Sequence, residues 1–411
     1  MKRQDLAIDI GRLINRIETL GKVGALDGGG VCRLALSEED KAGRELVAGW
    51  MTTLGLQVKV DAIGNIIGLR PGRAEGAPVM TGSHIDTVST GGLYDGSLGV
   101  LAGLEVVETL NDTGLETDRP LAVAVFTNEE GVRFSPDMMG SLVYVGGLAV
   151  ADALATRGID GESLGACLSK IGYNGEAPCG APEVAAFVEL HVEQGPLLEA
   201  EGITIGAVQK VQGISWREFK IRGVSNHAGT TPMHLRHDAG FAAAAIVGEV
   251  RRIAAEFGGD QVGTVGALDL RPNLVNVIAN QATLSVDLRN TDDDELMRAE
   301  QRLQGFVERL AGQEGVEIES RALARFAPVD FDMSIVGKVE ATARRLGHSV
   351  KPMSSGAGHD AQMLARACPA GMIFVPSEAG ISHNVGEYTA PEDLEAGANV
   401  LLHVLLDLAG A

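Results

Sequence analysis

"PVMTGSHIDTVSTGGLYDGSLGVLAGLEVVETLND", residues 78–112, contains a short apolar run, a glycine-rich loop and a segment with helical periodicity. A second short apolar run, PLAVAVFTNEEG at residues 120–131, follows it. This order of strand, loop, helix and strand is typical of a crossover unit, because parallel strands cannot be joined by a tight turn. The stretch therefore predicts an α/β domain with a mixed, mainly parallel sheet flanked by helices.

The sequence changes character near Gly206, which indicates a second domain. An alternating segment is followed by two helical segments that enclose a further pair of strand-like segments. This β-helix-β-β-helix order predicts an α+β unit at residues 211–327, inserted into a first domain made of residues 1–210 and 328–411. Two domains also suit the length of 411 residues, because single cores stop growing at roughly 250–300 residues.

Composition narrows the class of protein. Lysine and arginine number 34 against 55 aspartate and glutamate residues, a net charge of −21. Such a surface repels phosphate backbones and anionic membranes, so we expect neither nucleic acid nor membrane as a partner. Residues 1–21 place apolar side chains on one helical face, which predicts an amphipathic helix rather than a signal peptide. The 4 cysteines show no CxxC spacing, so we expect a reduced, cytoplasmic protein.

Charged side chains follow several of the predicted strands or lie in glycine-rich loops. Any one of them could be a loop cap or a satisfied polar contact, but several in one sheet favour a shared site, because burying charge is costly unless it is paired or metal-bound. These residues are His84, Asp86, Asp95, Glu129, Glu130, His191 and His383.

Imidazole and carboxylate ligands suit Zn, Mn, Co or Ni, and the lack of paired cysteines argues against a structural zinc site. Histidines with one terminal and one bridging carboxylate would leave open positions on two metals, the arrangement that two-metal hydrolases use. The adjacent glutamates Glu129 and Glu130 can face different ways, so one could bind metal while the other accepts a proton from water.

The motifs GSHIDTV, GGLYDGSLGVLAGLE, NEEGVRF, HVEQGP, SNHAGTTPM, SGAGHDA and SHN occur in this order along nearly the whole chain. This pattern resembles the M20 metallopeptidase clan and, more narrowly, its amidase/hydantoinase/carbamoylase branch. That branch contains N-carbamoyl-L-amino acid hydrolases, allantoate amidohydrolases and β-ureidopropionases.

The resemblance implies two divalent metal ions (Zn, Mn, Co or Ni) per subunit. One would be bound by His84, Asp95 and His191, and the other by Asp95, Glu130 and His383, with Asp95 bridging. Glu129 would be the general base. Asp86 would fix the tautomer of His84 by accepting the other ring N–H.

The resemblance also assigns residues to the substrate. His227 would stabilise the oxyanion and would come from the partner subunit, which makes a homodimer part of the mechanism and the inserted unit a dimerisation and lid domain. Asn276 and Arg289 would clamp the substrate carboxylate, and Gln194 and the Gly358 backbone would complete the pocket.

The favoured reaction is hydrolysis of the ureido C–N bond of an N-carbamoyl-L-amino acid, with release of carbon dioxide, ammonia and the amino acid. Three alternatives stay open: an allantoate amidohydrolase, an M20 aminoacylase or dipeptidase, and a metal-dependent binding protein without activity. The remaining histidines carry weaker hypotheses. His348 and His403 are expected in packing or solvent contacts, His234 and His237 in a loop and helix cap or a substrate or dimer contact, and His359 lies near the site without being a ligand.

Overall fold

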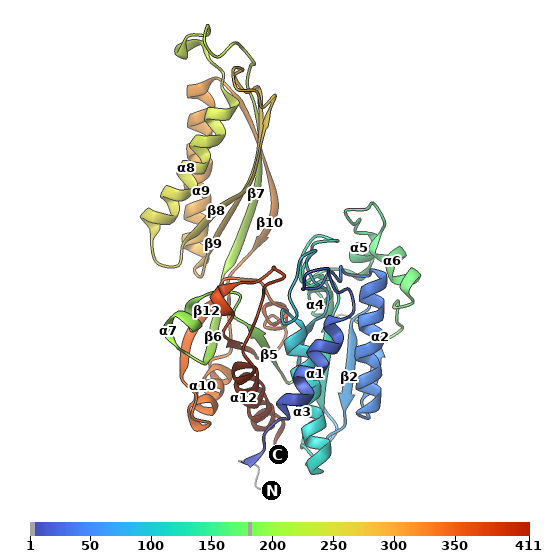
Figure 1. Ribbon diagram of the computed structural model, residues 1–411. Coiled ribbons are helices and arrows are strands. Elements are labelled where there is room, and N and C mark those ends of the chain that lie inside the picture. Colours follow the sequence, from blue (N-terminus) through green and yellow to red (C-terminus); the bar gives the residue numbers. More distant parts are fainter. Residues whose placement is uncertain (1–4, 180–182) are drawn as a thin grey trace. The chain divides into compact units, whose positions relative to one another are not determined.

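The computed structural model describes residues 5–179 and 183–411 (Figure 1). The chain divides into two compact units, Met1–Gln209 with Asp330–Ala411 and Lys210–Val329. Among the described residues, no helix combines the length and apolar character needed to cross a membrane.

The first unit is built on a nine-stranded mixed sheet in the order β1-β2-β4-β3-β5-β13-β6-β11, with β12 also paired to β6. The central strands β4, β3, β5 and β13 are mutually parallel, and antiparallel strands extend the sheet on both sides. The strands are β1 Gln57–Val60, β2 Ile66–Arg70, β3 Val79–His84, β4 Leu121–Phe126, β5 Ala186–Val192, β6 Ile205–Val211, β11 Val329–Asp330, β12 Val350–Ser355 and β13 Ala370–Val375.

Helices cover both faces of this sheet. Leu190 and Val375 contact Gly397 of α12 on one face, whereas the neighbouring residues His191 and Phe374 contact His359 beside α11 on the other. The helices of the unit are α1 Ile10–Gly21, α2 Glu38–Thr53, α3 Ser97–Thr113, α4 Met139–Tyr144, α5 Val150–Ala155, α6 Leu164–Ile171, α7 Leu197–Glu201, α10 Met333–Arg345, α11 Asp360–Leu364 and α12 Pro391–Ala409, with a 3-10 turn η3 at Glu378–Gly380.

The four central strands are buried along their whole length, which explains their nearly continuous apolar sequences. α3 approaches the sheet so closely that a Cβ at Gly99 would lie 2.6 Å from the Leu190 carbonyl oxygen. The predicted mixed, mainly parallel sheet flanked by helices is therefore confirmed. The N-terminal helix begins only at Ile10, because the Asp9 side chain caps it; residues 1–4 of that prediction lie outside the described residues.

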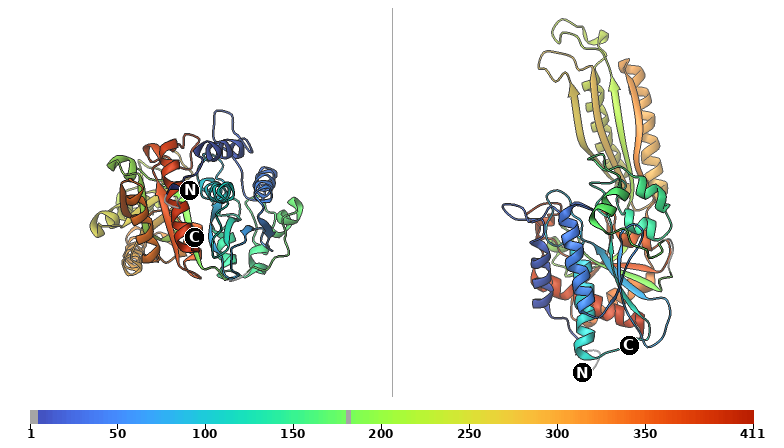
Figure 2. Two further views of the ribbon diagram at one scale, coloured as in Figure 1. Left: turned by 90° about the horizontal axis from the view of Figure 1, so that it is seen from below. Right: turned by 90° about the vertical axis from the view of Figure 1, so that its right-hand side faces the viewer.

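The second unit is a four-stranded antiparallel sheet in the order β10-β7-β9-β8, with α8 and α9 side by side on one face (Figure 2). The buried side chains of β9 alternate with half-buried ones, so one face of the strand packs on the helices. Its elements are β7 Gly213–Arg222, η2 Met233–Leu235, α8 Ala239–Phe257, β8 Val262–Arg271, β9 Gln281–Asn290, α9 Asp293–Glu314 and β10 Glu317–Phe326.

The α+β character of this unit agrees with the prediction, but the predicted order lacked its last strand. β10 is an edge strand with a largely exposed, charge-rich sequence, EIESRALARF. An edge strand exposed in this way shows little apolar alternation, so its pairing with β7 depends on tertiary contacts rather than on a local pattern.

Candidate active site

The charged residues predicted to share a site do converge in the first unit. His84 ends β3, His191 lies near the end of β5, and Glu129 with Glu130 follows β4. Because these strands are parallel, their carboxyl ends meet at one edge of the sheet. Two loops complete the cluster: Asp95 precedes α3, and His383 follows β13.

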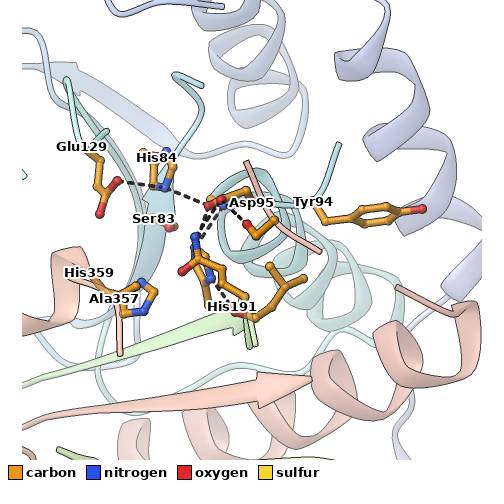
Figure 3. Close-up of polar contacts among 12 residues, drawn as sticks. Ser83, His84, Tyr94, Asp95, Glu129, His191, Ala357 and His359 are labelled. Carbon is orange, nitrogen blue, oxygen red and sulfur yellow. Dashed lines mark hydrogen bonds and ion pairs between the residues drawn. The ribbon is translucent and has the colours of Figure 1, made fainter. Parts of the chain in front are cut away.

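Asp95 lies at the centre of this cluster (Figure 3). Its Oδ1 is 3.6 Å from His84 Nε2 and 3.3 Å from His191 Nε2. Its Oδ2 is 3.4 Å from His383 Nε2, which is also 3.3 Å from Glu130 Oε2. The two carboxylate oxygens thus face two different groups of ligand atoms, each group lying within 4.8 Å.

The donor atoms fit a pair of divalent cations. Burial opposes ionisation of Asp95, but hydrogen bonds from His191 and His383 outweigh it and hold the pKa of Asp95 well below its usual value. Burial and the charge of Asp95 raise the pKa of Glu130 well above its usual range. The buried Gln194 Oε1 beside this group has no hydrogen-bond partner within residues 5–179 and 183–411. Nitrogen and oxygen donors without thiolates match Zn, Mn, Co or Ni.

The histidines of the first group present the correct nitrogen to such an ion. Burial lowers the pKa of His84 to about 4, so the ring is neutral. His84 Nδ1 lies 2.9 Å from the Asp86 carbonyl oxygen, and His191 Nδ1 lies 2.9 Å from the Val192 carbonyl oxygen. An Nδ1–H donating to a carbonyl leaves Nε2 as the nitrogen that would bind an ion. His84 already presents a lone pair there, whereas His191 would first lose its Nε2 proton: burial lowers its pKa, but the hydrogen bond to Asp95 outweighs this and raises the pKa to about 9.

The expected contact between Asp86 and the ring N–H of His84 is made by the backbone of Asp86. The backbone carbonyl of Asp86, not its carboxylate, accepts from His84. The carboxylate accepts instead from the backbone N–H of Glu129 at 3.2 Å and of Glu130 at 3.3 Å. Because the carbonyl makes the contact with the ring, the side chain is free to hold the neighbouring loop. Asp86 therefore positions the two glutamates.

Those adjacent glutamates face different ways. Glu129 Oε2 lies 3.3 Å from His84 Nε2, whereas Glu130 faces His383. The loop that carries them turns at Asn128, whose φ of 58° is in the left-handed region that asparagine tolerates. Its amide also donates to the Phe134 carbonyl at 2.8 Å, which closes the loop. Burial, and then the charges of nearby carboxylates, raise the pKa of Glu129 well above its usual range.

The two substrate residues expected in the first unit also lie here. Gln194 Nε2 donates to Asp95 Oδ2 at 2.8 Å, so its amide contacts the expected bridging ligand. Gly358 lies directly before the buried His359, and a Cβ at Gly358 would lie 2.7 Å from Met138 Cε. Both positions border the cluster.

His227, Asn276 and Arg289 belong to the second unit, where they do not form one group. His227 and Asn276 lie together, because Ala228 N donates to the Asn276 carbonyl oxygen at 3.0 Å. Arg289 pairs in the ladder with Ile214, near the start of β7, while His227 follows the end of that strand. At about 3.3 Å per residue, the part of β7 from Ile214 to Arg222 alone spans ~26 Å. Arg289 is paired with Asp287 at 2.8 Å.

Other buried polar residues around the cluster escaped sequence reasoning. The Glu189 carboxylate accepts from Ser83 Oγ at 2.6 Å. His359, by contrast, was expected near the site, and its ring centroid lies 4.5 Å from that of His191. Glu387 contacts the backbone of Asp95 from a loop nearly three hundred residues away in sequence. A single glutamate in a buried strand or loop gives no periodic signal. His403, expected in packing, is buried and contacts the Leu6 carbonyl oxygen.

Known proteins share this architecture. Residues 80–407 match peptidase family M20/M25/M40. The chain is 40% identical over 403 residues to the N-carbamoyl-L-amino-acid amidohydrolase of Rhizobium meliloti, covering 98% of this chain and 97% of the relative. It is 34% identical over 412 residues to the allantoate amidohydrolase of Bacillus subtilis (strain 168), covering 100% of both. The crystal structure of an amidase of the hydantoinase/carbamoylase family from Burkholderia multivorans matches with a TM-score of 0.93 at 44% identity, covering 99% of each chain.

The fold is thus that of a metallopeptidase-type hydrolase, and the histidine and carboxylate cluster offers candidate metal ligands. The chain belongs to peptidase family M20/M25/M40, as its motifs predicted, and it is an amidohydrolase of that family.

Proposed function

We propose that this enzyme hydrolyses the ureido C–N bond of an N-carbamoyl-L-amino acid and releases carbon dioxide, ammonia and the amino acid. The observation that carries the proposal is the placement of Glu129 beside a cluster centred on Asp95. The amidohydrolase named for this substrate in Rhizobium meliloti supports the substrate class.

In this proposal His84, Asp95 and His191 would hold one divalent ion, and Asp95, Glu130 and His383 would hold a second. Bound there, they would lower the pKa of water and polarise the ureido carbonyl. Asp95 joins the two positions through its two oxygens.

Glu129 is the proton carrier of the reaction. Its carboxylate faces the centre of the cluster and is held by the Asp86 contact with its backbone N–H. Burial, and then the charges of nearby carboxylates, raise its pKa well above the usual range, which strengthens the carboxylate as a proton acceptor. It accepts the proton of the attacking water and delivers it to the leaving nitrogen.

The substrate clamp then requires two copies of the chain. In this proposal residues 1–210 and 328–411 form the catalytic domain and residues 211–327 form a dimerisation and lid domain. Arg289 and His227 are too far apart along β7 to contact one small substrate together. A homodimer resolves this separation if Arg289 of the chain binds the carboxylate while His227 and Asn276 reach the other subunit's site. Gln194 and the Gly358 backbone complete the pocket.

Allantoate is the second candidate substrate, because the amidohydrolase of Bacillus subtilis named for it covers the whole chain. It carries a carboxylate for the same clamp and a second ureido group that needs further polar partners.

The test is ammonia and amino acid release after reconstitution of metal-stripped protein with Mn²⁺, Zn²⁺ or Co²⁺. The substrates are N-carbamoyl-L-methionine, its D-isomer, allantoate, β-ureidopropionate and N-acetyl-L-methionine. Dominant turnover of the L-carbamoyl compound supports the proposal. Dominant turnover of allantoate would make allantoate the substrate instead of the N-carbamoyl-L-amino acid. Methionine released from the acetyl compound alone, without ammonia, would identify an aminoacylase. If the metal-loaded protein turned over none of the five compounds, the proposed substrate class would be refuted.

A further inference from the structure

Glu387 lies in the loop between β13 and α12 and is 5% exposed. Its Oε1 accepts from the backbone N–H of Tyr94 and of Asp95, both at 3.0 Å. Its Oε2 accepts from Ser382 Oγ at 3.2 Å, and the same hydroxyl lies 3.1 Å from Asp95 Oδ2. Glu387 and Ser382 therefore hold Asp95 by both its backbone and its carboxylate.

The chain leaves no room for this contact to shift. A Cβ at Gly92 would lie 2.4 Å from the Glu387 side chain, and a Cβ at Gly96 would lie 2.4 Å from the His84 ring. The loop that carries Asp95 is thus pressed between Glu387 on one side and His84 on the other. Gly96 has a φ of 62°, a conformation that glycine adopts without strain.

The Glu387 and Ser382 hydrogen bonds also involve the loop of His383, the least buried of the expected metal ligands. The His383 side chain is 51% exposed, and its backbone φ is 53°. Ser382 directly precedes His383, and Glu387 follows it by four residues. The same hydrogen bonds that orient Asp95 therefore tie down the loop that presents His383.

We propose that Glu387 is a positioning residue that sets the orientation of Asp95 and couples it to the His383 loop. The ion held by Asp95, Glu130 and His383 then depends on Glu387 more strongly than the ion at His84 and His191. This inference rests on the proposed two-ion centre. Partners that orient ligands in this way are typically worth 10- to 100-fold in metal affinity.

The test is titration of the metal-free protein with Mn²⁺, with free ion measured by electron paramagnetic resonance. Glu387→Gln retains an acceptor for the backbone N–H groups but replaces the oxygen that accepts from Ser382. Ser382→Ala removes the hydroxyl while leaving Glu387 in place. It provides a second test of the same contact if Glu387→Gln does not fold. The control is Glu105→Gln, the same change at a fully buried carboxylate that accepts from Asp9 N and pairs with Arg12 and Arg16.

We expect wild-type protein to bind two Mn²⁺ ions. Glu387→Gln should bind the first as wild type and the second at least tenfold more weakly, and Ser382→Ala should shift the same ion in the same direction. At Mn²⁺ concentrations near the wild-type affinity, kcat should fall while KM stays within about twofold. Glu105→Gln should lower Tm without changing either affinity.

Unchanged binding of the second ion in both variants would overturn the proposal. So would equal weakening of both ions together with a loss of Tm like that of Glu105→Gln, because that result describes a purely structural role. Wild-type protein that binds fewer than two ions would instead refute the two-ion centre of the proposed function.

Discussion

Replacing Asp86 by asparagine should change the stability of the metal-free protein in opposite directions at acid and at alkaline pH. Burial, reinforced by the charge of Asp40, raises the pKa of Asp86 from 3.8 to about 7. A difference of about 3 pKa units corresponds to ~4 kcal/mol. Because the folded-state pKa is the higher one, this stability is present below pH ~4 and is lost as the pH rises through about 7.

The substitution also lowers the free energy of unfolding by an amount that does not depend on pH. The Asp86 carboxylate accepts from the backbone N–H of Glu129 and of Glu130. Asparagine keeps one acceptor and turns an NH₂ group toward the other N–H, which costs about 1–3 kcal/mol at every pH. Asp86→Asn should therefore be less stable than wild type by about 1–3 kcal/mol below pH ~4. By pH 5 about 1.6 kcal/mol of this deficit should already be offset, because the carboxyl of the unfolded chain ionises above pH 3.8 while the folded one stays protonated. Above pH 8 it should be more stable by a similar amount, because wild type then carries the ionised buried carboxylate.

The assay is urea unfolding followed by circular dichroism, in chelator, between pH 5 and pH 8.5. Asp160→Asn is the control, because a hydrogen bond from Arg133 lowers the pKa of that exposed carboxylate. Its contribution is lost only as the pH falls through the lowered pKa, so this variant should differ from wild type by a constant amount in this range. Between pH 5 and pH 8.5 the free-energy difference should move by about 2.7 kcal/mol in favour of Asp86→Asn, and a difference that stays constant over this range would refute the burial argument.

Two further predictions concern the reaction. Glu129→Gln should lower kcat by about 10²–10⁴-fold, while Mn²⁺ titration still shows wild-type binding; a variant with near-normal kcat would remove Glu129 from the proton transfer. Mixing equal amounts of unfolded Glu129→Gln and His227→Ala subunits and refolding them should restore about a quarter of wild-type activity, because half of the dimers are mixed and each has one intact site. Recovery indistinguishable from the sum of the two parent variants would place His227 in the same chain's site or outside the mechanism.

The central sheet could be predicted from the sequence because each of its strands is marked by a short continuous segment. Short apolar runs such as LAVAVF are continuous since both faces of a central parallel strand are covered, and the run itself records this burial. β10 was missed for the opposite reason. Its residues are exposed and charged, and it pairs with β7 through main-chain hydrogen bonds that leave no periodic signature.

The cluster was predictable for a related reason. His84, Glu129 and His191 each end or follow a predicted parallel strand, and topology brings the carboxyl ends of such strands together. Asp95 and His383 were candidates because they lie in glycine-rich loops, and the motif resemblance then assigned them as metal ligands. The resemblance identified which residues meet, but not which atoms of those residues make the contacts.

By itself, the sequence determined the α/β class, the crossover that builds the sheet and the chemical type of the site, because these follow from periodicity and residue type along short segments. Only the tertiary structure decided that Asp86 uses its carbonyl toward His84 and that Glu387 holds the backbone of Asp95. The same is true of the ladder register that separates Arg289 from His227. The reason is physical: contacts between loops and the register of strand pairs depend on how close two distant backbones pack, and local propensity carries no record of that distance.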